Sequence, residues 1–163
     1  MIKKNTIKKN ELLIFSIIFF VTLLLSRISI PLINTSGLMP DYFLALFVSL
    51  IASRFMSMNI YILFFLGLCI DLLAGELIGQ YGLVLIVIYF TNFLLNKYFL
   101  FKSQVMLASQ HLILTTIGLI ILLISSLSYE LSVNINIFMM KWIVTYLVCL
   151  LYSRLIQFLS NKI

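Results

Sequence analysis

Apolar residues run along this chain in six long stretches, separated by short polar or glycine-containing segments. The stretches cover residues 12–30, 42–55, 60–74, 83–95, 111–127 and 138–159. A helix needs about 20 mostly apolar residues to cross the hydrocarbon core of a bilayer. The second, third and fourth stretches are shorter, so we expect their helices to extend into the flanking residues. The pattern predicts a single transmembrane domain over residues 1–163, an all-α membrane protein that forms a compact bundle of about six helices.

The composition favours a membrane protein over a soluble one. Hydrophobic residues make up 63% of the chain, charged residues make up 10%, and the mean hydropathy is +1.20. A soluble domain has about 45–50% apolar and about 25% charged residues, and a small domain leaves much of its surface exposed. The sequence also shows no carboxylate pair at acid/base spacing, no Ser–His–Asp grouping and no phosphate-binding glycine loop. We therefore expect no enzymatic activity, no cofactor and no metal site.

The charges predict an orientation. The net charge is +6, and the basic residues lie between the apolar stretches, which favours the positive-inside rule over nucleic-acid binding. With a cytoplasmic N-terminus, nine basic residues fall inside: Lys3, Lys4, Lys8, Lys9, Arg54, Lys97, Lys102, Arg154 and Lys162. Only Arg27 and Lys141 fall in the outer half. Both termini, including the basic segment 1–11, are therefore expected in the cytoplasm, where the Lys3 to Lys9 cluster would also attract anionic lipids.

One segment, residues 67–79, combines glycines with an acidic residue. Gly67, Asp71, Gly75 and Gly79 recur every four residues, so they share one face for as long as the helix continues. Small residues at this spacing let a second helix approach closely inside a membrane. Alternatively, Gly75 and Gly79 mark only the end of a helix and the turn that follows it.

Asp71 is the only acidic residue inside an apolar stretch. A charge near the bilayer centre costs about 2.5–3.5 kcal/mol, so we expect Asp71 to face the bundle or a wet cavity and to have a partner. Arg27 and Lys141 lie at a comparable outer depth and are the candidate partners, and a neutral, protonated carboxyl is the alternative. A structural role is favoured over a ligand or proton site. His111, at the cytoplasmic start of the fifth stretch, is expected to be solvated.

Residues 67–75, Gly-Leu-Cys-Ile-Asp-Leu-Leu-Ala-Gly, followed by Gly79, resemble a pattern of the rod shape-determining protein MreD family. That pattern is a glycine, then Asp-Leu, a small residue and a glycine, and a further glycine in the turn. Pro40 and Asp41, which open the second stretch, match the Pro-Asp or Pro-Asn of the family. Length, the short basic N-terminus and five or six spans also fit. Arg27 and Lys141 belong to no pattern of the family.

The resemblance implies a non-enzymatic scaffold in the bacterial cytoplasmic membrane, which maintains rod shape and guides lateral peptidoglycan synthesis. Its implied partners are an MreC-like bitopic membrane protein and, indirectly, the MreB filament, RodA and penicillin-binding protein 2. The implied fold is similar to the substrate-binding components of energy-coupling-factor transporters. This similarity supplies the alternative function, the binding of a vitamin or metal for such a transporter. Those components usually carry an alanine-x-x-x-alanine patch on the first helix, whereas residues 12–30 contain no alanine, which favours the scaffold.

Overall fold

The computed structural model describes residues 9–27, 39–53, 59–74, 78–98, 104–127 and 135–160. Within these ranges the chain forms six α-helices and no strand. The helices are α1 (Lys9–Arg27), α3 (Tyr42–Ser53), α4 (Ile60–Ala74), α5 (Gln80–Tyr98), α6 (Gln104–Leu127) and α7 (Ile135–Ser160). The predicted all-α fold is confirmed for this part of the chain.

The helices differ in length. Helix α5 extends beyond 83–95 at both ends, as expected. Helices α3 and α4 begin at the first residue of their apolar stretches, Tyr42 and Ile60, so the extension expected at these two starts is wrong. Among the described residues, three helices contain a segment that is long and apolar enough to cross a membrane: Gln80–Tyr98, Val105–Ser125 and Ile135–Leu159. The other three are shorter apolar helices, and α3, with 12 residues, is the shortest of the six. These properties are consistent with a membrane protein.

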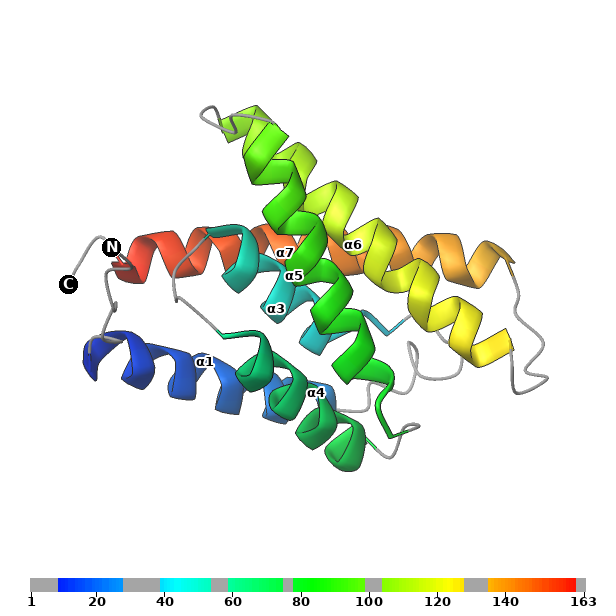
Figure 1. The fold of residues 1–163 in the computed structure, drawn as a ribbon, viewed down its shortest axis with the longest axis horizontal. Coiled ribbons are helices and arrows are strands. Elements are labelled where there is room, and N and C mark those ends of the chain that lie inside the picture. The colour runs from blue at the N-terminus through cyan, green and yellow to red at the C-terminus, as the bar shows by residue number, and fades with distance from the viewer. Residues whose placement is uncertain are drawn as a thin grey trace.

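Helix α3 lies at the centre of the bundle and packs against α1, α5, α6 and α7. Every residue from Phe43 to Ala52 is buried, as expected for a helix that is apolar on all sides. Helix α1 covers α3 through Phe15 and Phe19, whose rings pack edge-on against Phe47. Figure 1 shows α5 crossing in front of α3, with α1 and α4 along one edge of the bundle.

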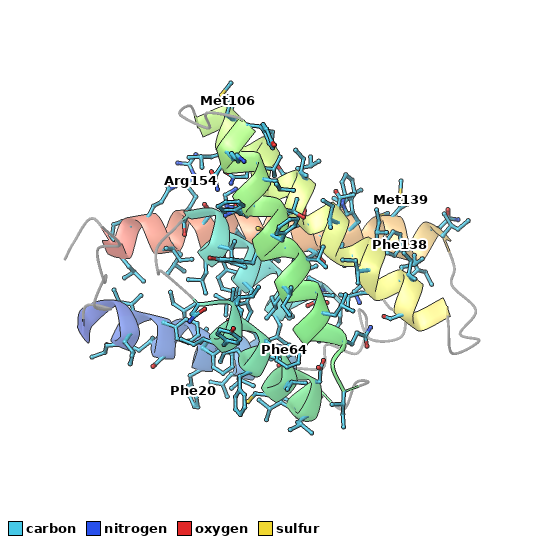
Figure 2. The ribbon with its side chains drawn as sticks, in the orientation of Figure 1. Phe20, Phe64, Met106, Phe138, Met139 and Arg154 are labelled. Carbon is cyan, nitrogen blue, oxygen red and sulfur yellow. The ribbon has the colours of Figure 1, made fainter. Side chains whose placement is uncertain are left out.

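Helix α1 begins and helix α7 ends on the same side of the bundle (Figure 1). A hydrogen bond of 3.0 Å between Thr22 Oγ1 and the Tyr152 hydroxyl joins these two helices. The surface of the bundle carries many large apolar side chains, and Figure 2 shows Phe20 and Met106 projecting from it. Soluble monomers rarely expose apolar patches of this extent, so the surface is suited to lipid.

Candidate functional site

The carboxylate of Asp71 is fully buried beside the first turn of α5. Its Oδ2 accepts a hydrogen bond from the Gly79 N–H at 2.7 Å, and its Oδ1 accepts one from the Tyr81 N–H at 2.9 Å. The first N–H groups of a helix have no partner inside the helix, and the helix dipole stabilises a negative charge there. Asp71, a residue of α4, therefore caps the helix that follows it.

Glycines bring α4 and α5 into direct backbone contact. A Cβ atom built on Gly67 would lie only 2.4 Å from the Cα of Gly82 on α5. Gly79, which directly precedes α5, has a φ of 96°, a left-handed conformation that glycine adopts without steric cost. The helix that approaches the glycine face of α4 is thus α5 of the same chain.

Asp41 caps the central helix in a similar way. Its Oδ1 accepts a hydrogen bond from the Leu44 N–H at 2.9 Å, the usual geometry of an N-cap aspartate. Its own N–H donates to Thr145 Oγ1 of α7 at 3.0 Å, and its Oδ2 accepts a bond from the Tyr81 hydroxyl at 2.6 Å. Pro40, directly before this cap, is half-buried. The first turn of α3 is therefore fixed to both α5 and α7.

Tyr81 joins the two carboxylates, because its N–H donates to Asp71 and its hydroxyl donates to Asp41. The Pro-Asp pair and the glycine–aspartate segment, which are distant in the sequence, thus meet at one side chain. We term Asp41, Asp71, Gly79, Tyr81 and Thr145 the carboxylate cluster. Sequence reasoning missed Tyr81 and Thr145; the position of Tyr81, two residues after the last glycine of the segment, was the available signal.

A second polar cluster lies at the other end of α3. Asn92 of α5 donates through Nδ2 to the Ile51 carbonyl at 3.2 Å, and Gln110 of α6 donates to Asn92 Oδ1. Tyr81 and Asn92 are about 16 Å apart along α5, which matches the length of about 18 Å for α3. A buried backbone group needs a hydrogen-bond partner within the protein, and Asn92 supplies one for the Ile51 carbonyl. Helix α5 thus bonds to both ends of the short, buried α3, through the Asp41 side chain at its start and through the Ile51 carbonyl at its end.

The two cations that were expected to pair with Asp71, Arg27 and Lys141, lie elsewhere in the structure. Arg27 donates to the Leu73 carbonyl at the end of α4, and Lys141 is half-buried on α7. The structure thus gives Asp71 backbone partners in place of either cation. Gly75, the fourth member of the glycine–aspartate face, lies outside the described residues.

His111 differs from its expected environment. Helix α6 begins at Gln104, so His111 lies well inside the helix, and its side chain is only 1% exposed. The expectation of a solvated histidine is wrong, because the helix starts before its apolar stretch does. His111 Nδ1 bonds to the Leu107 carbonyl at 2.6 Å, and Nε2 has no partner in the part of the chain that the structure describes.

Comparisons with protein-family models, curated proteins and solved structures found no match to this chain. Each of the four carboxylate oxygens of Asp41 and Asp71 accepts a hydrogen bond from the protein itself. These bonds fix the relative positions of α3, α4 and α5, and the bond of the Asp41 N–H to Thr145 adds α7.

The Tyr81 hydroxyl can be tested separately from its backbone. Tyr81→Phe removes the donor to Asp41 Oδ2 and leaves the backbone bond to Asp71 in place, so we expect a loss of about 1–3 kcal/mol of stability. The measurement is thermal unfolding of the purified protein in detergent. Tyr89→Phe is the matched control, because this half-buried tyrosine lies on the same helix. Equal melting temperatures for the two variants would contradict a structural role for the Tyr81–Asp41 bond.

Proposed function

We propose that this protein is a non-enzymatic membrane scaffold of the MreD type, which maintains rod shape and guides lateral peptidoglycan synthesis. It lies in the bacterial cytoplasmic membrane and binds an MreC-like bitopic protein. Through that partner it acts with the MreB filament, RodA and penicillin-binding protein 2. The proposal starts from the resemblance carried by residues 67–79 and by Pro40 and Asp41.

One observation carries the proposal: the residues of the resemblance gather in a single hydrogen-bonded unit. Asp41, Asp71 and Gly79 all belong to the carboxylate cluster, and Gly67 fixes the crossing of α4 and α5. These residues set the geometry of the bundle and face its interior. A protein that organises partners needs a rigid helix arrangement with an apolar outer surface, and these residues supply that rigidity.

The membrane arrangement that we propose has six spans and two cytoplasmic termini. The positive-inside bias supports this orientation, and the start of α1 and the end of α7 on one side fit an even number of spans. The short length of α3 is compatible with a span, because α3 is enclosed by other helices and hydrogen-bonded to α5 at both ends. The fold that we propose is similar to that of the substrate-binding components of energy-coupling-factor transporters.

The transporter function is the weaker alternative for a physical reason. A vitamin-binding site needs polar groups that are free to bond the ligand. In the carboxylate cluster, Asp41, Asp71 and Tyr81 are already bonded to one another and to helix ends. The missing alanine patch in residues 12–30 points the same way.

The experiment is depletion of the protein in a rod-shaped bacterium that carries it. We expect round cells whose new wall material, followed with a fluorescent D-amino acid, is no longer confined to the sidewall. Expression of the wild-type chain from a second locus should restore rods, whereas Asp71→Leu should not. Normal rods that have lost uptake of a vitamin would reject the scaffold in favour of the transporter component.

A further inference from the structure

One face of helix α7 is exposed and apolar over most of its length. Large exposed side chains recur on it every three or four residues: Met140, Ile143, Leu147, Leu151, Leu155 and Phe158. Residues at this spacing share one face of a helix, and we term this face the α7 stripe. Arg154, labelled in Figure 2, is exposed on the same stripe between Leu151 and Leu155. A single cation therefore interrupts a surface that is otherwise suited to lipid.

Arg154 has no partner within the part of the chain that the structure describes. No hydrogen bond or ion pair of its guanidinium is found there, whereas the other described arginine, Arg27, donates to the Leu73 carbonyl. Arginine on an apolar membrane surface normally pairs with an anion, with a carbonyl or with the polar interface. The anion for Arg154 must therefore come from outside the described chain.

Helix α1 indicates how deep Arg154 lies. Tyr152 of α7 bonds to Thr22 of α1, and the two helices run in opposite directions (Figure 1). From Thr22 toward the start of α1, exposed apolar side chains continue as far as Leu12, over about 15 Å. On α7, exposed Phe158 lies about 6 Å beyond Arg154 in the same direction. Arg154 is therefore set into the apolar surface, from which its long side chain can extend toward the interface.

We propose that Arg154 binds the phosphate group of an anionic phospholipid in the inner leaflet, with the acyl chains of the lipid along the α7 stripe. The planar guanidinium donates two parallel hydrogen bonds to phosphate oxygens. A zwitterionic headgroup carries a cation beside its phosphate, which Arg154 repels, so a lipid with a net negative charge is preferred. This contact at one residue is distinct from the general attraction expected at Lys3 to Lys9. The inference rests on the proposed membrane arrangement and does not depend on the scaffold role.

Site-specific tryptophan quenching tests this proposal. In a Trp142→Phe background, one reporter is Phe158→Trp, one turn after Arg154, and the other is Phe93→Trp, one turn before Lys97 on α5; both positions are exposed. Each is reconstituted in dioleoyl phosphatidylcholine with a small fraction of brominated lipid. This lipid is either dibrominated phosphatidylglycerol or dibrominated phosphatidylcholine with the same acyl chains. At Phe158→Trp we expect the phosphatidylglycerol to bind about fivefold more tightly than the phosphatidylcholine.

Substitution of the cations separates a site at Arg154 from overall charge. Arg154→Gln should abolish the preference at Phe158→Trp, and Arg154→Lys should retain only part of it, because lysine keeps the charge but not the planar fork. Lys97→Gln is the matched control, since it removes another exposed cation near the cytoplasmic end of a helix, and it should leave the preference at Phe158→Trp unchanged.

The remaining outcomes overturn the inference at different levels. A preference that survives Arg154→Gln, or that falls equally in Lys97→Gln, would mean that overall charge attracts the lipid. Loss of the preference in inorganic phosphate, but not in sodium chloride of equal ionic strength, would assign Arg154 to a soluble anion. Quenching at Phe93→Trp but not at Phe158→Trp would mean that protein covers the α7 stripe. Absence of quenching at both positions would reject the membrane arrangement itself, and cell shape after depletion is read independently of all these results.

Discussion

Asp71→Leu should lower the free energy of unfolding by about 1–6 kcal/mol, because it leaves one buried and one partly buried N–H donor without an acceptor, at up to about 3 kcal/mol each. These donors belong to Gly79 and Tyr81, at the start of α5. The variant also removes a negative charge from the positive end of the helix dipole. We therefore expect low folded yield and a large fall in the thermal unfolding temperature in detergent.

Asp71→Asn is the control that separates the hydrogen bonds of Asp71 from its charge. Asparagine keeps one acceptor oxygen, but its amide group is a donor and would face one of the two N–H groups. The free energy of unfolding of Asp71→Asn should therefore lie between that of the wild type and that of Asp71→Leu. If Asp71→Leu unfolded at the same temperature as the wild type, the cap formed by Asp71 would contribute nothing to stability. Equal losses for the two variants would instead indicate that the charge alone matters.

The sequence predicts the fold best where local composition determines the helix. Helix α4 begins where its apolar stretch begins, because polar Asn59 directly precedes it. The glycine–aspartate spacing indicated a packed face, and Gly67 does pack against another helix. The spacing did not reveal which helix, because close approach depends on small residues on both sides, and Gly82 carried no separate signal in the sequence.

The partner of Asp71 was not predictable for a different reason. Every residue but proline carries a backbone N–H, so residue type does not single out Gly79 and Tyr81 as donors. The side chains of Arg27 and Lys141, by contrast, are recognisable as cations from the sequence. Depth along the helices made those cations plausible partners. The start of α5 lies at Asp71 instead, with the left-handed Gly79 directly before α5 and its N–H bonded to the carboxylate.

The start of α6 shows how tertiary contacts override a hydropathy pattern. Because polar residues such as Gln110 precede it, the fifth span was expected to begin at residue 111, yet α6 begins at Gln104. Gln110 is buried because it bonds to Asn92, which in turn bonds to the Ile51 carbonyl at the end of α3. Such a pair lowers the mean hydropathy of both helices, although the two polar side chains are hydrogen-bonded to each other inside the protein.

Gly67→Ala should be the more damaging of two opposed glycine substitutions. The added Cβ would lie 2.4 Å from the Cα and 2.5 Å from the N of Gly82, and 2.8 Å from the carbonyl carbon of Tyr81. All three atoms are backbone, so the neighbouring helix must move as a whole. Overpacking of this kind costs about 1–3 kcal/mol, and sometimes more. The movement would also pull Tyr81 away from Asp71, so we expect a loss at or above the top of that range.

Gly82→Ala is the matched control, because it adds the same methyl group at the same helix crossing from the opposite side. Its Cβ would meet the ring of Phe64 at 3.1 Å, and Figure 2 shows Phe64 where α4 and α5 meet. A side chain can turn where a backbone cannot, so we expect a loss of about 1 kcal/mol or less. Unfolding in mixed micelles compares the two alanine variants directly. Equal losses would mean that the α4–α5 crossing is loose enough to absorb a methyl group on either side, and the close contact could then not be what holds Asp71 against the start of α5.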